Sequence, residues 1–547
     1  MYIREKGSPR SNSTSLQICQ SYRNDAGQPR SKVLLTLGPK DELLQSGQVT
    51  KLISSLAKLA GIQERSDLFK DDILEEIFRS NWGVPYLLTH LWDVFELQNF
   101  FKQQKLKIKF DLNQTILNQV VDRFLKPRSK LGFYENQHDY LTSNHKLKLH
   151  HLYRSLSALA RLKPNLEKHL LDVNRNLFNM KVDIVFFDAT TIYFQSDKVD
   201  DLRKFGFSKD CKFNDVQIVM GLLMDEDGRP IGFQTFPGNT FDGKTLIKAV
   251  TDLKATFAIN KLIIVGDRGI CSQANIDAIK ESGYEYIVGT SLKKQDRKLQ
   301  EQILDDNGYT SVNKSDLEEF KYKEIQLKDE RLIISWSSSR ARKDFYDRER
   351  LVEKANEILD GKSKLKKPGK AKYLKINEEV QYLDEARIMD DAKWDGYYGI
   401  KTNVCKDLKS ETEIYDAYKQ LWRIEDCFRV LKSHLKIRPV FLWNPEHIEG
   451  HLVLCFLTFV FERHLEIELR KKGVETSPTK IRAALEKLQA SIVSAGGKEF
   501  PSIATISQEA SQIFEASGIA VPQRQQIVSL LKQSQKMTCS DHALSSL

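Results

Sequence analysis

The sequence has few cysteines and no closely spaced pair of them. Its 547 residues contain 7 cysteines, an odd number with no CxxC spacing. Zinc sites and disulfide frameworks depend on such spacing or on even pairing. The sequence therefore indicates neither a zinc site nor a disulfide-stabilised fold, and we expect the cysteines to be reduced thiols.

Long apolar runs and a signal peptide are missing as well. The longest apolar run, residues 452–461, has about half of the roughly 20 residues that a membrane-spanning helix needs, so we expect a buried core helix. The first six residues, MYIREK, lack the apolar stretch of a signal peptide. We therefore expect a cytoplasmic protein without a membrane partner.

Composition favours a globular protein with a polyanionic partner. Hydrophobic residues make up 41% of the sequence and charged residues 29%, which is the balance of a folded chain. Lys and Arg number 84 against 74 acidic residues, and the resulting charge of +10 suits nucleic acid binding without proving it. Because ordinary domains have roughly 100–200 residues, a chain of this length predicts about two to four structural units.

The first 178 residues change from strand to helix periodicity. Apolar residues alternate over 15–22 and 32–37 on either side of an Asn-Asp-Ala-Gly turn, which predicts a β-hairpin within residues 1–38. Residues 39–178 show helical spacing of their apolar residues and predict an all-helical unit.

The order of elements in residues 179–290 matters most for the fold. Apolar runs rich in β-formers give three strands, a helix, a strand, a helix and a strand. The expected strands are 182–187, 217–224, 230–236, 262–265 and 284–289, and the expected helices are 242–259 and 273–281. This order predicts an α/β protein with an RNase H-like catalytic core.

The rest of the chain interrupts and then completes this core. Residues 291–408 carry strand signals around a lysine-dense stretch at 362–375, and we expect an inserted, β-containing subdomain with an exposed loop. The sequence leaves open whether that loop is a solvated linker or contacts a partner. The core is expected to resume over 409–470, and residues 471–547 are expected to form C-terminal helices with a frayed tail from about 534.

Two aspartates, Asp188 and Asp267, each follow an expected apolar strand directly. In an open α/β sheet that edge is where ligands bind. Neighbouring carboxylates raise each other's pKa, and a divalent cation is the usual remedy. Either aspartate alone could occupy a turn or cap a helix, but the pair in this strand order predicts a metal site.

A third carboxylate is expected on a helix over 415–432. Tyr418, Glu425 and Lys432 are spaced by seven, so on an ideal helix each is displaced by only about 20° from the one before. Arg429 falls on the same face, and such a stripe suits a metal-bound phosphate. The spacing leaves open an exposed amphipathic helix with ordinary pairs such as Glu425 with Arg429.

Several sequence tracts occur in a set order between about 180 and 470. They are Phe186-Phe187-Asp188-Ala189-Thr190-Thr191, Gly206-Phe207-Ser208-Lys209-Asp210, Phe236-Pro237-Gly238-Asn239-Thr240, Val265-Gly266-Asp267-Arg268-Gly269 and the helix from Tyr418 to Lys432. Together they resemble the bacterial insertion-sequence transposases of the DDE class. Within that class the chain is similar to the group with a Tyr-x2-Arg-x3-Glu-x6-Lys signature and a long insertion ahead of the catalytic Glu. A weaker similarity extends to Asp122-Arg123-Phe124 and Pro127-Arg128-Ser129-Lys130.

The resemblance assigns roles to individual residues. It implies that Asp188, Asp267 and Glu425 are the catalytic metal ligands. The DNA contacts that it implies are Tyr418 and Lys432, with Arg429 as a further candidate, and Thr190 and Arg268 are the other candidates for the site. Leu421 stands where the signature has Arg, which puts the phosphate contact of that Arg in doubt, and Arg429 could partly replace it.

The resemblance also implies a reaction and its partners. Two Mg²⁺ or Mn²⁺ ions, about 3.5–4 Å apart, would support phosphoryl transfer. Hydrolysis at the element end would free a 3′-hydroxyl, which then attacks target DNA. The implied partners are double-stranded DNA, as terminal inverted repeats and target, and a second copy in a homodimer, in a nucleoid-associated location. The helical unit and the basic insertion would recognise the ends through phosphate contacts.

Two other functions fit parts of the sequence. A haloacid-dehalogenase-like phosphatase also places acids after apolar strands, but Thr190 and Cys271 stand where that family needs further acids. An inactive or domesticated transposase relic would bind DNA without cutting it, and Leu421 is the hint for it. The histidines show no convincing metal-binding spacing, and we expect packing or DNA contact from His447 and His451.

Overall fold

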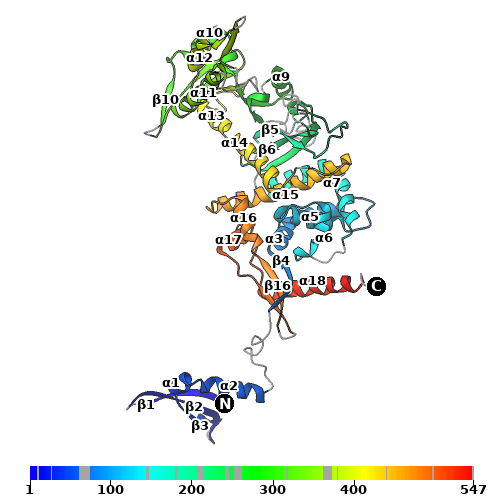
Figure 1. Cartoon of the computed structure of the whole chain (residues 1–547), viewed down its shortest axis with the longest axis vertical. Helices are drawn as coiled ribbons and strands as arrows, with labels where there is room; N and C mark the ends of the chain where they lie inside the picture. Colours follow the sequence, from blue (N-terminus) through cyan, green and yellow to red (C-terminus); the bar gives the residue numbers. More distant parts are fainter. Residues whose placement is uncertain are drawn as a thin grey trace.

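The computed structural model describes the chain except residues 9–10, 26, 61–73, 143–146, 179–182, 207–213, 241–244, 250, 252–261, 271, 316–317, 361–371, 378–379, 439, 496–497 and 545–547. The molecule is elongated, with a large sheet at one end, a helical body in the middle and a small N-terminal unit at the other end (Figure 1). No helix in the described part of the chain is long and apolar enough to cross a membrane.

The N-terminal unit is a three-stranded antiparallel sheet with two helices. Its elements are β1 (Tyr2–Ser8), β2 (Ser11–Arg23), β3 (Pro29–Pro39), α1 (Lys40–Gln45) and α2 (Gln48–Leu59), with β2 in the middle of the sheet. The predicted strands over 15–22 and 32–37 are present, and Ile18 pairs with Leu35. The sheet is larger than the predicted hairpin because β1 pairs with β2 although its residues do not alternate.

The helical body is built around a long buried helix. Its elements are α3 (Gly83–Val94), α4 (Leu97–Gln103), α5 (Leu112–Leu125), α6 (Lys130–Glu135), α7 (Leu149–Phe178) and α15 (Pro445–Lys471). Helix α15 packs along α7 and against α5, and the two long helices lie side by side in Figure 1. Residues 452–461 are buried throughout, which confirms the predicted core helix.

Two predictions about the ends of this body are wrong. The unit over 39–178 is not all-helical, because β4 (Glu75–Asn81) pairs with β16 (Gln489–Ala495), which in turn pairs with β17 (Lys498–Ile503). Strand β4 finds its partner about four hundred residues away, and no local pattern signals such a pairing. The C-terminal segment therefore contains strands besides α16 (Pro478–Glu486) and α17 (Gln508–Ala516). The segment from about 534, expected to be a frayed tail, is helical as far as residue 544, because α18 (Arg524–Leu544) continues through it.

The large sheet contains the predicted RNase H-like order of strands. Its core strands are β5 (Ile184–Tyr193), β6 (Gln217–Met224), β7 (Pro230–Pro237), β8 (Ile263–Gly266) and β9 (Glu285–Thr290), with spatial order β7-β6-β5-β8-β9. Strands β5 to β7 are antiparallel, and β8 and β9 run parallel to β5. Helix α9 (Gln273–Glu281) packs against β9 as predicted, whereas most of the helix expected over 242–259 lies outside the described residues.

The insertion continues this sheet instead of forming a separate one. Strand β15 (Tyr397–Thr402) pairs with β9 and leads outward to β12 (Arg331–Ser337), β11 (Glu318–Gln326) and β10 (Thr310–Ser315), which gives nine described strands in one sheet. Around them lie α10 (Arg297–Leu304), α11 (Ser338–Leu359), α12 (Glu385–Ala392) and the hairpin of β13 (Leu374–Asn377) and β14 (Val380–Leu383). The lysine-dense stretch falls largely outside the described residues.

Candidate active site

Asp188 and Asp267 lie next to each other at one point of the sheet. Strands β5 and β8 are parallel, and their last paired residues are Phe187 and Gly266. Asp188 and Asp267 each follow that pair by one residue, so the two carboxylates leave adjacent strands at the same level. One detail of the prediction is wrong: Asp188 lies within β5, not after its end, because β6 pairs with β5 as far as Tyr193.

Backbone amides orient both aspartates. Asp188 Oδ1 accepts a hydrogen bond from the amide of Ala189 at 2.7 Å, and Asp267 Oδ1 accepts one from the amide of Gly269 at 2.8 Å. Asp188 is half-buried and Asp267 is exposed. The carboxylates are therefore held at the rim of a cavity and open to it.

Glu425 reaches the same cavity from a helix that is not continuous. The helix expected over 415–432 is divided into α13 (Glu411–Lys419), α14 (Trp422–Arg429) and a π-helical turn, Val430–His434. Helix α14 packs against β5, and Glu425 is exposed on it. The spacing by seven assumed one ideal helix, whereas the tight turn at 420–421 and the wider π turn each rotate the residues that follow.

A cavity of about 480 Å³ brings the three predicted carboxylates together. Its described lining includes Asp188, Asp267 and Glu425, together with Tyr418 and Leu421 from the same helical segment. Leu421 thus forms part of the cavity wall at the position where the signature has Arg. Tyr418, Glu425 and Leu421 share one cavity despite the helix break, because α13 packs against β8 and β9 and α14 packs against the neighbouring β5.

Four of the remaining candidates lie outside this cavity. Arg429 is 73% exposed and forms an ion pair with Asp426, and Lys432 is half-buried in the π turn; neither lines the cavity as described. Arg429 is therefore not in the place of the missing signature Arg. Thr190 shares a strand face with Asp188 but is only 5% exposed. Arg268 is exposed beside Asp267 and lines a second cavity.

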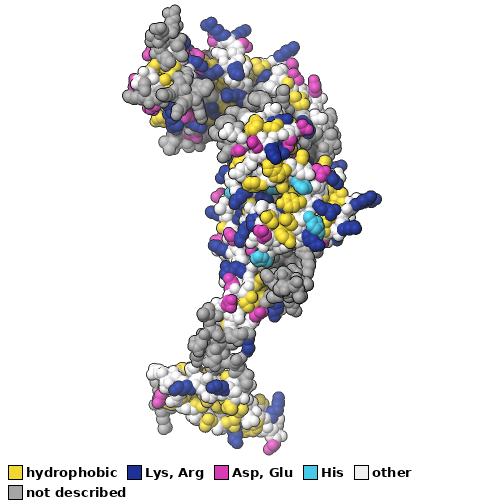
Figure 2. All heavy atoms as spheres, turned by 45° about the vertical axis from the view of Figure 1, so that its right-hand side comes forward, with side chains coloured by type: hydrophobic (Ala, Val, Ile, Leu, Met, Phe, Trp, Pro, Cys, Tyr) yellow, Lys and Arg dark blue, Asp and Glu magenta, His cyan; other side chains and the backbone are white. Residues whose placement is uncertain are grey.

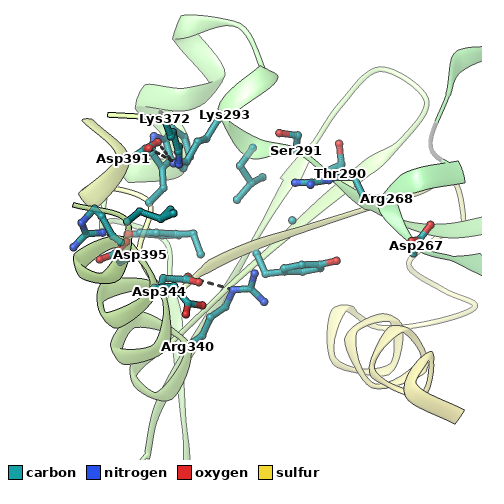
Figure 3. A pocket seen from close by; sticks show the side chains of 18 of the residues that line it. Asp267, Arg268, Thr290, Ser291, Lys293, Arg340, Asp344, Lys372, Asp391 and Asp395 are labelled. Carbon is teal, nitrogen blue, oxygen red and sulfur yellow. Dashed lines mark hydrogen bonds and ion pairs between the residues drawn. The ribbon is translucent and has the colours of Figure 1, made fainter. Parts of the chain in front are cut away.

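The second cavity, of about 520 Å³, adjoins the first and extends under the insertion. The two share Asp267, Arg340, Tyr398 and Tyr418 in their linings. Figure 3 shows Asp267 and Arg268 on the core side and Arg340 from α11 on the insertion side. At the far end Asp391 bonds Lys293 and Lys372. Burial alone would raise the pKa of Asp391, but these hydrogen bonds outweigh it and hold the pKa well below its usual range.

Arg340 and Tyr398 are site residues that the sequence did not reveal. The Arg340 guanidinium lies over the Tyr398 ring, 4.6 Å from its centre, and Arg340 Nε lies 3.5 Å from Asp344 Oδ2. The Tyr398 hydroxyl is hydrogen-bonded to that of Tyr418. Burial, and then Tyr398 and Asp267, raise the pKa of Tyr418 far above its usual range, so this hydroxyl stays protonated. Both residues come from the insertion, and no sequence spacing ties them to Asp188.

The donor set of the cavity fits a hard divalent cation in kind. Three carboxylates without a thiol or imidazole are ligands that Mg²⁺ accepts, and its preference for retaining water suits an open cavity. In the described residues no three His, Cys, Asp or Glu side chains converge closely enough to hold an ion by themselves. Asp188, Asp267 and Glu425 therefore surround a shared space that bound phosphate oxygens and water would have to complete.

Comparisons with known proteins identify the family to which the chain is similar. The family model described as "Transposase DDE domain" matches residues 180–461, just over half of the chain. The model described as "IS1634 family transposase, N-terminal domain" matches residues 3–67. A search of curated proteins finds no match. Among solved structures, a cryo-EM structure of a piggyBac transposase synaptic complex with hairpin DNA matches over 82% of each chain. The TM-score is 0.34 and the sequence identity is 9%, so the likeness is low.

Proposed function

The chain belongs to the DDE transposase family, as an insertion-sequence transposase of the IS1634 family, and from this premise we propose that Asp188, Asp267 and Glu425 hold two Mg²⁺ or Mn²⁺ ions and cut and join DNA at the element ends. DNA phosphoryl transfer is the activity of this family, which decides against the haloacid-dehalogenase alternative. The observation that carries the residue assignment is the single cavity lined by these three carboxylates.

The reaction has two balanced steps. In the first, a water oxygen bonds to phosphorus at the element end, and the departing 3′ oxygen takes a proton to become a 3′-hydroxyl. In the second, that hydroxyl loses its proton, bonds to a target phosphorus and displaces a target 3′ oxygen. When bound, the two ions supply Lewis-acid stabilisation of the charge that develops on the phosphate oxygens. The carboxylates hold those ions, and the backbone amides of Ala189 and Gly269 fix the aspartates.

We propose that the DNA-end contacts of this chain follow the Tyr-Arg-Glu-Lys signature, with one residue replaced. Tyr418 lines the cavity as a protonated hydroxyl and can donate to a phosphate oxygen. Arg340 lines the same cavity as Leu421. It would supply the positive charge of the signature Arg, whose position Leu421 occupies. Lys432 remains a candidate for a more distant phosphate, since it lies in the π turn that follows α14 and outside the cavity lining.

The partners follow from the same reaction. We propose double-stranded DNA with terminal inverted repeats as the substrate, a second DNA segment as the target, and a homodimer that pairs the two ends. The helical body and the second cavity, next to the insertion, would contact DNA phosphates, so DNA binding should weaken steeply as the salt concentration rises. The reaction would take place on chromosomal DNA in the cytoplasm.

The test is cleavage of a duplex carrying the terminal repeat and its flank, with Mg²⁺. The wild type should nick at the repeat end, and Asp188→Asn should be inactive while binding the duplex normally. Asp183→Asn is the matched control, because Asp183 is exposed just before β5 and does not line the cavity. Binding without nicking by the wild type would instead support the inactive relic. Full activity of Asp188→Asn would overturn the assignment of the metal ligands.

A further inference from the structure

A second concentration of positive charge lies in the helical body, in a cavity of about 220 Å³. This cationic cavity is lined by Arg123, Pro127, Arg128, Ser129, Lys130, Tyr153, Lys436, Arg438, Val440, Phe441, Leu442 and His451. None of these described lining residues is acidic. On the face shown in Figure 2, Lys, Arg and His side chains are interspersed with apolar ones over the middle of the molecule.

Lys130 is buried in this cavity and forms no direct ion pair with a described residue, although the charge of Asp122 acts on it. The residue is 7% exposed, and its side chain has no hydrogen bond or ion pair with any residue that the structure describes. Burial, and then the neighbouring Arg123, lower the pKa of Lys130 to about 7. An unpaired buried ammonium is costly, so an anion that enters the cavity would be bound partly by relief of this cost.

Arg123 is a second buried cation that forms no direct ion pair with a described carboxylate, although the charge of Asp122 acts on it. It is 5% exposed, and its guanidinium donates to the backbone carbonyls of Leu435 at 3.2 Å and Arg128 at 3.0 Å. The nearby carboxylate of Asp122 is already engaged, because it accepts from Arg128 Nε at 2.7 Å and from the Tyr140 hydroxyl at 3.2 Å. Arg123 and Lys130 therefore line the same small cavity, where the single charge of Asp122, shared with Arg128, offsets only part of theirs.

The size and chemistry of the cationic cavity suit a single phosphate group. Its volume is below the roughly 300–1,000 Å³ of sites for drug-sized ligands. Lys and Arg are the usual phosphate-binding side chains, Lys as a point charge and Arg as a fork of donors. The pKa of His451 is well below its usual range because of burial, so this side chain is neutral and adds a polar group without charge.

The fold connects the cationic cavity to the active site through strand β5. The amide of Val440 donates to the carbonyl of Tyr193 at 3.4 Å, and Tyr193 ends the strand that carries Asp188. Five residues of strand, at about 3.3 Å each, separate the two positions by about 17 Å. Neighbouring phosphates of one DNA strand advance about 3.4 Å along the helix axis while they also turn around it, so the cavity lies within a few nucleotides of the cleaved bond.

We propose that the cationic cavity binds one backbone phosphate of the transposon-end DNA, within a few nucleotides of the cleaved bond, with Lys130 and Arg123 as its ligands. The proposal rests on the proposed function only in taking DNA as the substrate. Phe441 lines the cavity and is 63% exposed, and Trp443, two residues further along the chain, is 55% exposed. Their rings would contact the sugar and base of that nucleotide.

The first test is the salt dependence of DNA binding by the full chain, measured by fluorescence anisotropy in EDTA so that no cleavage occurs. A short duplex carrying the terminal repeat is the probe. Lys130→Met should weaken binding about tenfold and lower the slope of log K against log salt by about 0.9, the contribution of one phosphate contact. Lys168→Met, an exposed lysine on α7, is the matched control and should change neither value. Unchanged affinity and slope in Lys130→Met would overturn the proposal.

The second test begins with the wild type alone. A neutral methylphosphonate is placed singly along each strand of the probe. The wild type should lose affinity about tenfold at one position within a few nucleotides of the cleavage site. In Lys130→Met the same substitution should cost nothing further, whereas Lys130→Arg keeps the charge and should keep the loss. A scan of the wild type without such a position would contradict the proposal.

A third measurement separates DNA from a free anion. If inorganic phosphate raises the melting temperature of the wild type but not of Lys130→Met, and the salt slopes for DNA are equal, the cavity binds a small anion and the DNA proposal fails. Failure of the proposed function would look different, since Asp188→Asn would then retain metal-dependent nicking whatever the binding results.

Discussion

The hydroxyls of Tyr398 and Tyr418 meet directly over Gly289 on strand β9. A Cβ at residue 289 would lie 2.8 Å from the Tyr398 hydroxyl, and it would lie closer still to that of Tyr418. Tyr398 belongs to the insertion and Tyr418 to the helix that leads to Glu425. The absence of a side chain at Gly289 therefore allows the insertion and the catalytic helix to close over the same strand.

Gly289→Ala should impair catalysis more than folding. The added methyl group must displace Tyr418 from the cavity wall, and overpacking of this kind costs about 1–3 kcal/mol of stability. We expect cleavage of the terminal-repeat duplex to fall at least about tenfold with metal binding retained, since a small misplacement of site residues is enough for such a loss. Tyr398→Phe, which removes one hydroxyl without crowding, should be milder. Equal activity of Gly289→Ala and wild type would show that the tyrosine pair does not position the site.

Arg340→Met should weaken end binding and cleavage, because it removes the cation beside Leu421. We expect a loss of about tenfold to a hundredfold in kcat/KM, the value of a charged contact to phosphate. Arg342→Met, an exposed residue on the same helix, is the control. Leu421→Arg in the Arg340→Met background should restore part of the activity. If Arg340→Met equals the control variant, Arg340 does not replace the signature Arg.

Gly450→Ala should destabilise the helical body. A Cβ at this position of α15 would lie 1.9 Å from the carbonyl oxygen of Leu156 on α7, and two helix backbones cannot separate as easily as side chains. We expect a loss of about 1–3 kcal/mol or more in the free energy of unfolding, measured by denaturant titration. Gly7→Ala, where nothing lies within 4 Å, should be neutral. A neutral Gly450→Ala would contradict the close contact of α15 with α7.

Asp225 should make stability depend on pH in an unusual direction. Burial raises the pKa of Asp225 to about 7, although its hydrogen bond from the amide of Arg229 opposes this. The folded state then binds more protons than the unfolded state between about pH 4 and 7, so the stability contributed by this group is lost as pH rises through that window. The loss is at most about 1.4 kcal/mol per pH unit.

Asp225→Asn should remove this dependence. The unfolding free energy of the wild type minus that of the variant should fall as pH rises from about 4 to about 7. Above about pH 7 this difference should stay constant. Urea titrations at several pH values measure this difference. Parallel profiles for the two proteins would show that Asp225 does not titrate in this window.

Much of the catalytic core could be predicted from the sequence, because its signals are local. The continuous apolar run before Asp188 and the one before Asp267 predict central strands, and their order sets the sheet topology that brings the two carboxylates together. Glu425 was assigned to the site from a helical face and from the family resemblance. In the structure Glu425 lines one cavity with Asp188 and Asp267 although the helix is broken.

Other features depend on pairings between distant parts of the chain. Strand β4 exists only with β16, and the continuation of the sheet into the insertion depends on the pairing of β15 with β9. Arg340 enters the active site by the same route, so no spacing in the sequence could reveal it. Arg429 shares the regular helix α14 with Glu425, but its side chain is exposed and pairs with Asp426, a contact that the spacing of residues does not predict.

The most direct test of the central claim is anomalous scattering from Mn²⁺ in crystals of the transposase bound to its terminal-repeat DNA. The account predicts two peaks in the cavity of β5 and α14, in contact with Asp188, Asp267 and Glu425, and their loss in Asp188→Asn crystals. Peaks ligated by other residues, or an unchanged pair in the Asp188→Asn protein, would contradict it.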